Sequence, residues 1–92
     1  MPRNPRMLSK TGIYHVMLRG NEKKNLFLDD KDKHKFIETL LLKKIETGFL
    51  IYAYCLMDNH VHLLMGEGRE QLATTMKRIN TSYVCYFNKK YQ

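Results

Sequence analysis

Cysteine, proline and long apolar runs are scarce in this sequence. It contains two cysteines and two prolines in 92 residues, and Cys55 and Cys85 show no CxxC or other metal-binding spacing. The longest apolar run, residues 49–57, is far shorter than the roughly 20 residues that a membrane helix needs. No apolar segment follows the basic N-terminus, as it would in a secretory signal. These absences predict a cytoplasmic protein with no membrane partner and with both thiols buried and reduced.

Acidic residues are also few. The chain has nine Asp and Glu against 16 Lys and Arg, which gives a net charge of +7. The excess is uneven: residues 1–24 and 69–92 are strongly basic, whereas residues 25–68 are slightly acidic. Both prolines lie in residues 1–11, which we expect to form an extended basic arm. This polarised charge favours a polyanionic partner, although the charge alone is also typical of a soluble surface.

The length predicts a single domain over residues 1–92. Apolar and turn-forming residues alternate along it in a pattern that predicts strands over 12–19, 49–56 and 59–65. Helices are expected over 29–48, with acidic residues in the first turn and a glycine at the end, and over 69–91. The connection at 57–59 is long enough for a hairpin but too short for a crossover helix.

The helical spacing of apolar residues predicts which side chains each helix buries. In the first helix these are Phe36, Ile37, Leu40, Leu41 and Ile45, and in the second Leu72, Met76, Ile79, Tyr83, Tyr86 and Phe87.

The order strand, helix, strand, strand, helix predicts an α+β fold of the ferredoxin-like type. In such a fold an antiparallel sheet carries both helices on one face, and the other face stays uncovered.

The triplet His60-Val61-His62 carries the clearest chemical signal. Side chains alternate along a strand, so both imidazoles point to the same face, about 6–7 Å apart along the chain. Val61, Leu63 and Met65 are expected to point to the opposite face, toward the helices, and Asn59 is expected to face away from His60. Two such histidines can be ligands of a divalent metal or ordinary surface residues, and His15 on the first strand is a possible neighbour.

A nucleophile is harder to find. The chain has no serine–histidine or cysteine–histidine signature, but it has six tyrosines. Tyr83, Tyr86 and Tyr91 lie on the last predicted helix, where the spacing is typical of core or rim residues.

Three stretches resemble the REP-associated tyrosine transposases. They are YHVMLRGNEKKNLF, IYAYCLMDNHVHLLM and INTSYVCYFNKKYQ, and the resemblance covers about residues 11–92. These proteins are IS200-like single-strand DNA transposases of the HUH endonuclease superfamily. The segment CLMDNHVHLL is the most specific, because it combines the histidine pair with its flanking strand context.

The resemblance implies that His60 and His62 bind Mg²⁺ or Mn²⁺. The metal would position the scissile phosphate of single-stranded or hairpin DNA, and a tyrosine hydroxyl would attack to give a 5′-phosphotyrosine and a free 3′-hydroxyl. Basic residues of the arm, the first strand and the last helix would hold the DNA backbone. These residues are Arg3, Arg6, Lys10, Arg19, Lys23, Lys24, Lys77 and Arg78.

One departure limits the comparison. The family's catalytic tyrosine lies on a later helix, beyond the position matched by Gln92, so no catalytic residue is assigned and the chain resembles an N-terminal portion of a transposase. A homodimer is possible. A non-catalytic single-strand nucleic-acid binding module is the main alternative. An RNA-binding domain is a weaker one, in which Tyr52 and Tyr54 would stack on bases unless they pack in the core.

Overall fold

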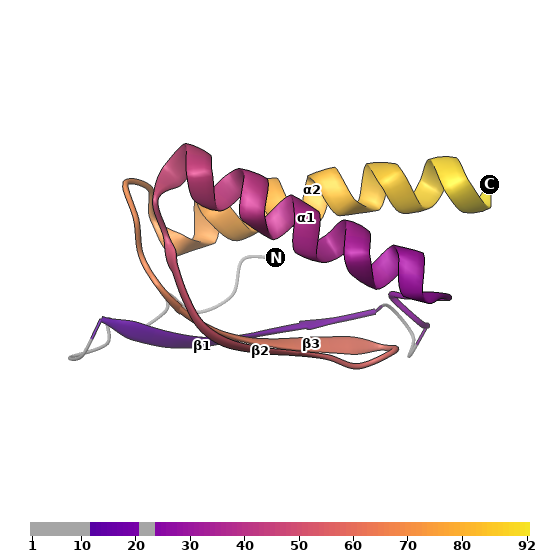
Figure 1. Cartoon of the computed structure of the whole chain (residues 1–92), viewed down its shortest axis with the longest axis horizontal. Coiled ribbons are helices and arrows are strands. Elements are labelled where there is room, and N and C mark those ends of the chain that lie inside the picture. Colours follow the sequence, from indigo (N-terminus) through magenta and orange to yellow (C-terminus); the bar gives the residue numbers. More distant parts are fainter. Residues whose placement is uncertain (1–11, 21–23) are drawn as a thin grey trace.

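A computed structural model describes residues 12–20 and 24–92 of the chain. The elements follow the expected order of strand, helix, strand, strand, helix (Figure 1). Their bounds are β1 Ile13–Arg19, α1 Asp30–Thr47, β2 Leu50–Leu56, β3 His60–Gly66 and α2 Leu72–Tyr91.

The three strands form one antiparallel sheet in the order β1-β3-β2. β2 and β3 form a hairpin, in which the Met57 N–H donates to the His60 carbonyl oxygen at 2.8 Å. β1 pairs with the other edge of β3, so the strand that carries the histidine pair is central. The pairing of β2 slips by one residue between Ile51 and Ala53, a bulge that leaves Tyr52 without a partner across the ladder.

Local sequence signals fix the ends of α1. The Asp29 side chain caps its first turn by accepting the Asp32 N–H at 2.9 Å, and Gly48 ends it in the left-handed conformation with φ 76°. The start of α2 differs, because Gln71 provides no side-chain cap. There the Leu72 N–H donates to a carboxylate oxygen of Glu67 at 2.8 Å.

Both helices lie on the same side of the sheet, as Figure 1 shows, which confirms the predicted fold class. Val61, Leu63 and Met65 of β3 are almost completely buried on that side, as their alternation with the histidines predicted. Burial of each such side chain stabilises the fold by about 1.5–3 kcal/mol. The matching residues of α2, among them Leu72, Ile79 and Tyr83, complete the core as expected. None of the helices in the described part of the chain is long and apolar enough to cross a membrane.

No helix among the described residues covers the other side of the sheet, which we call the open face. Residues opposite one another in an antiparallel pair share a face, so the register assigns its members. Met17 and Cys55 lie opposite His62 on its two sides, Arg19 lies opposite His60, and His15 lies opposite Leu64. The open face therefore includes His15, Met17, Arg19, Ala53, Cys55, His60, His62 and Leu64.

The predicted inner face of α1 was partly wrong. Phe36 and Leu40 are buried, but Leu41 and Ile45 are 56% and 77% exposed. The buried stripe of α1 instead contains Thr39 and Thr47, whose hydroxyls donate to backbone carbonyls four residues earlier. Because these hydroxyls are satisfied within the helix, threonine can occupy buried positions that a purely apolar pattern does not identify.

The prediction that both thiols are buried was also wrong. Cys55 and Cys85 are exposed and form no disulfide. Cys55 lies on the open face, opposite His62, and Cys85 lies on the outer side of α2. Tyr52 and Tyr54 on the edge strand β2 are 52% and 55% exposed, so they do not pack in the core.

Candidate functional site

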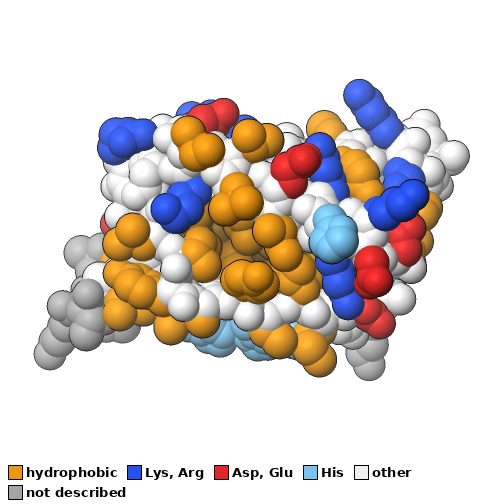
Figure 2. All heavy atoms as spheres, in the orientation of Figure 1, with side chains coloured by type: hydrophobic (Ala, Val, Ile, Leu, Met, Phe, Trp, Pro, Cys, Tyr) orange, Lys and Arg blue, Asp and Glu red, His pale blue; other side chains and the backbone are white. Residues whose placement is uncertain are grey.

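Three histidines meet on the open face. The rings of His15 and His62 stack with centroids 5.1 Å apart and planes 5° from parallel. His15 Nε2 lies 3.0 Å from His62 Nδ1, which is a hydrogen-bond distance. The ring of His60 stands nearly perpendicular to that of His62 with centroids 4.9 Å apart. In Figure 2, histidine side chains gather along the lower rim of the molecule, beneath the sheet.

Asn59 contacts His60, contrary to the prediction that it faces away. Its Oδ1 atom lies 2.7 Å from His60 Nδ1. The alternation rule does not apply to Asn59, because β3 begins only at His60 and Asn59 belongs to the turn before it. Asn59 is therefore a direct neighbour of the histidine pair.

His60 and His62 are suited to act as two ligands of a divalent cation. The Nδ1 atoms of His60 and His62 are occupied, and within residues 12–20 and 24–92 no hydrogen bond engages Nε2 of either ring. An imidazole bound to a metal through one nitrogen characteristically has the other nitrogen hydrogen-bonded in this way. The described residues contain no cluster of three or more histidine, cysteine or acidic side chains arranged as a metal site.

The predicted DNA-binding residues that the structure describes lie on two different surfaces. Arg19 is exposed on the open face opposite His60. The exposed Lys24 is close to it, because the backbone of Lys24 packs directly on Gly20, where a Cβ would collide with the Lys24 carbonyl oxygen. Arg3, Arg6, Lys10 and Lys23 lie outside the described residues.

Lys77 and Arg78 belong to α2 and therefore to the opposite side of the sheet from the histidines. Together with Lys43 they line a shallow concavity between the two helices. Arg78 forms an ion pair with Glu70 at 2.8 Å, so its charge is partly neutralised. The structure thus places Arg19 on the face that carries the histidines, with the backbone of Lys24 close to the end of β1, and leaves the basic residues of α2 on a separate surface.

Comparison with protein families identifies this chain. The family model described as Transposase IS200 like matches residues 9–92. The chain belongs to the IS200-like transposase family. No curated protein and no solved structure matches it significantly. A role in DNA transposition therefore follows from family membership.

In this IS200-like transposase the hydroxyl groups of the α2 tyrosines all form hydrogen bonds within the protein. The hydroxyls of Tyr86 and Tyr91 each donate to a different carboxylate oxygen of Asp32 at 2.6 Å. The Tyr83 hydroxyl donates to the Leu26 carbonyl oxygen at 2.7 Å. All three hydroxyls point to the start of α1, in the helix layer, which agrees with the prediction that they are core or rim residues.

Asp32 is the centre of this arrangement. Its side chain is completely buried, and it also accepts the Leu28 N–H at 2.8 Å and the ammonium group of Lys90 at 2.9 Å. Burial raises the pKa of Asp32, but the hydrogen bonds from Tyr86, Tyr91 and Lys90 outweigh it and hold the pKa below its ordinary value.

The same contacts make the tyrosine hydroxyls poor nucleophiles. Burial raises the pKa of Tyr83, and the hydrogen bond to the Asp32 carboxylate raises that of Tyr86. For Tyr91, burial and then the bond to Asp32 have the same effect. Each hydroxyl is thus kept protonated and engaged, which is the reverse of nucleophile activation.

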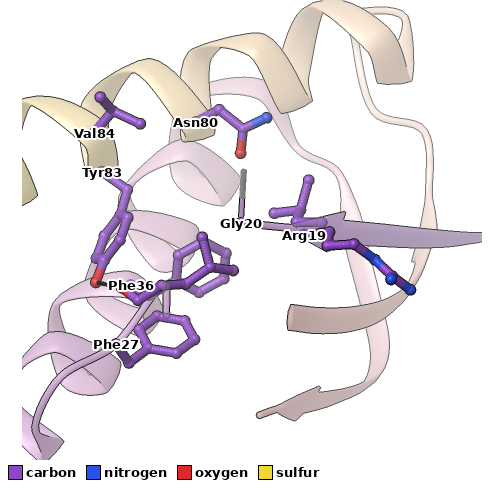
Figure 3. A pocket seen from close by; sticks show the side chains of 9 residues that line it. Arg19, Gly20, Phe27, Phe36, Asn80, Tyr83 and Val84 are labelled. Carbon is purple, nitrogen blue, oxygen red and sulfur yellow. Dashed lines mark hydrogen bonds between the residues drawn. The ribbon is translucent and has the colours of Figure 1, made fainter. Parts of the chain in front are cut away.

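A pocket of about 260 Å³ lies between the end of β1 and the two helices. In Figure 3 the rings of Phe27, Phe36 and Tyr83 lie together on one side of it, and the Arg19 side chain extends away from it. Most of its lining is apolar, and its one tyrosine hydroxyl is already bonded to the backbone. The described residues that line the pocket include no pair of reactive groups comparable to the histidines of the open face.

One cluster in the helix layer and one contact in the candidate site were not found by reasoning from the sequence. The cluster around Asp32 joins it to Tyr86, Lys90 and Tyr91, which lie 54 to 59 positions further along the chain. No local sequence pattern predicts contacts between residues so far apart. The signal available was an aspartate in the first turn of α1 together with tyrosines near the end of α2. The contact between Asn59 and His60 was missed because the strand was extended one residue too far.

Proposed function

We propose that this chain binds single-stranded or hairpin DNA and supplies two metal ligands, His60 and His62, to the nicking and strand-transfer site of a tyrosine transposase of the HUH type. The observation that carries the proposal is the histidine pair on an uncovered sheet face, with each Nδ1 occupied and each Nε2 free of hydrogen bonds in the described chain. Family membership supplies the link to DNA.

The cofactor in this proposal is Mg²⁺ or Mn²⁺, and two imidazole ligands favour Mn²⁺ of the two. When bound, such an ion polarises a phosphoryl oxygen and stabilises the charge that develops during displacement. The protein residues have separate tasks. His60 and His62 orient the ion, and Arg19 and Lys24 hold the DNA backbone beside it. Lys77 and Arg78 offer a second contact surface on the helix layer. None of the tyrosines of α2 is assigned as the nucleophile.

Binding of Mn²⁺ tests the metal site. We expect His60→Ala and His62→Ala each to abolish Mn²⁺ binding in calorimetry while the amide NMR spectrum stays that of a folded protein. His34→Ala is the matched control, because His34 is exposed on α1, in the other layer of the fold. Unchanged Mn²⁺ affinity in both open-face variants would remove the metal-site assignment.

The DNA function has its own test. The protein is mixed with labelled single-stranded hairpins and Mn²⁺ and analysed on native and denaturing gels. Binding on the native gel is the expected result, and its absence would contradict the proposal. A covalent adduct on the denaturing gel would show that a tyrosine within this chain is a working nucleophile, contrary to the bonding of Tyr83, Tyr86 and Tyr91.

The second candidate is a non-catalytic module that binds single-stranded nucleic acid. The exposure of Tyr52 and Tyr54 favours it, because exposed aromatic rings can stack on bases. This candidate predicts affinity for DNA that is independent of Mn²⁺ and of both histidines. Competition between matched RNA and DNA hairpins separates the RNA-binding variant of this idea, which requires preference for RNA.

A homodimer remains part of the proposal. Leu41, Leu42 and Ile45 on α1 are all more than half exposed, and a second copy of the chain would shield such side chains. Sedimentation equilibrium measures the oligomeric state directly, and a monomer at micromolar concentration would remove the dimer from the account.

A further inference from the structure

The Nδ1 contacts of His60 and His62 influence which nitrogen of each ring carries the proton. A neutral imidazole carries one proton, so only one of its nitrogens can bind a metal. Which nitrogen is available depends on where the proton resides. The partners of Nδ1 therefore decide whether His60 and His62 can use Nε2 toward a cation.

At His60 the partner is unambiguous. The Asn59 Oδ1 atom at 2.7 Å is an amide oxygen, which only accepts hydrogen bonds. His60 Nδ1 must therefore donate, and the proton of the neutral ring resides there. Nε2 of His60 then has a free lone pair.

At His62 the partner is the Nε2 atom of another imidazole, at 3.0 Å. One proton lies between the two rings, and it belongs either to His62 or to His15. If it is on His62 Nδ1, then Nε2 of His62 is free for a metal. If it is on His15 Nε2, then the neutral His62 ring is protonated on Nε2 and cannot bind through that atom.

We propose that Asn59 and His15 are positioning residues, which accept hydrogen bonds from Nδ1 of His60 and His62 and thereby present Nε2 of both rings to a divalent cation. This inference rests on the proposed metal site and adds the residues that orient it. The stacked arrangement of His15 on His62, with planes 5° from parallel, also fixes the orientation of the His62 ring. Hydrogen-bonded partners of metal ligands commonly act in this way.

The tautomers of the metal-free wild-type protein provide the first test. Long-range ¹H–¹⁵N NMR of the imidazoles at pH 8, where histidine is mostly neutral, distinguishes a protonated Nδ1 from a protonated Nε2. We expect His60 and His62 both to carry the proton on Nδ1. Finding either ring protonated mainly on Nε2 would overturn the positioning role, even if Mn²⁺ binds.

Variants of the two partners provide the second test, with Mn²⁺ as the probe in calorimetry. We expect Asn59→Ala and His15→Ala each to weaken Mn²⁺ binding roughly 10- to 100-fold and to mix the tautomers of the adjacent ligand. His15→Gln, which offers an amide oxygen as acceptor in place of the ring nitrogen, should recover most of the affinity and the Nδ1-protonated form of His62. His34→Ala serves again as the control.

The outcomes separate this inference from the function on which it rests. Wild-type protein that does not bind Mn²⁺ would overturn the metal site and the positioning role with it. Wild-type binding that His60→Ala abolishes, combined with unchanged affinity in Asn59→Ala and His15→Ala, would overturn the positioning role alone. Failure of His15→Gln to restore both affinity and tautomer would show that His15 acts through packing and not through its acceptor nitrogen.

Discussion

The two sides of the sheet use polar residues in opposite ways. In the helix layer, Asp32 is fully buried and its carboxylate accepts bonds from Leu28, Tyr86, Tyr91 and Lys90. On the open face, the histidines are exposed or half-buried, and among the described residues His60 and His62 form hydrogen bonds only through Nδ1. A cluster whose bonds are all internal stabilises the fold, whereas a cluster with unused ligand atoms is available for chemistry.

The largest expected effect concerns stability. Asp32→Ala removes a buried carboxylate that joins the start of α1 to the end of α2, so we expect a loss of about 3 kcal/mol in the free energy of unfolding. Urea denaturation measures it. Asp30→Ala, at an exposed acid in the same helical turn, is the matched control and should cost well under about 1 kcal/mol. Equal losses in the two variants would contradict the structural role of Asp32.

The second prediction is that the free energy of unfolding falls at acidic pH. The native pKa of Asp32 is lowered, so its contribution is fully present above the unfolded pKa near 4. It is lost progressively as the pH falls from about 4 toward the lower native pKa. We expect Asp32→Asn to flatten this part of the stability profile, measured by urea denaturation between pH 2 and 7. A profile as steep as that of the wild type would show that other carboxyl groups cause the acid sensitivity.

Removal of a single donor to Asp32 should have a smaller effect. Tyr86→Phe deletes a hydrogen bond to a buried carboxylate and should lower the free energy of unfolding by about 1–2 kcal/mol. Tyr54→Phe is the control, since that side chain is more than half exposed on the edge strand. Neither substitution should change Mn²⁺ affinity, and a changed affinity in Tyr86→Phe would link the two sides of the sheet.

The smallest effect is expected in DNA binding. Arg19→Ala should weaken binding to a single-stranded hairpin several-fold and reduce the slope of log K against log salt by about 1. Arg78→Ala should change it less, because Arg78 is paired with Glu70 in the helix layer. Fluorescence anisotropy over a range of salt concentrations compares them. A larger loss for Arg78→Ala would place the main DNA surface on the helices.

The sequence predicted the fold and the placement of His60 and His62 on one face of β3, because both depend on local patterns. The alternation of Val61, Leu63 and Met65 with the histidines sets the two faces of β3, and the acidic start and glycine end delimit α1. Prediction from the sequence failed where residues far apart in the chain come into contact and where polar residues are buried. The hydrogen bond between Asp32 and Tyr91 joins residues 59 positions apart, and in the buried stripe of α1 threonines stand where the periodicity predicted apolar residues.

Paramagnetic broadening by Mn²⁺ tests the division between the two sides most directly. In ¹H–¹⁵N spectra titrated with sub-stoichiometric Mn²⁺, the account predicts that the amides of His60, His62 and their cross-strand neighbour Met17 lose intensity first. The amides of Asp32 and Tyr91 should keep theirs. Broadening that begins around Asp32, at the acidic end of α1, would contradict the assignment of the chemistry to the open face.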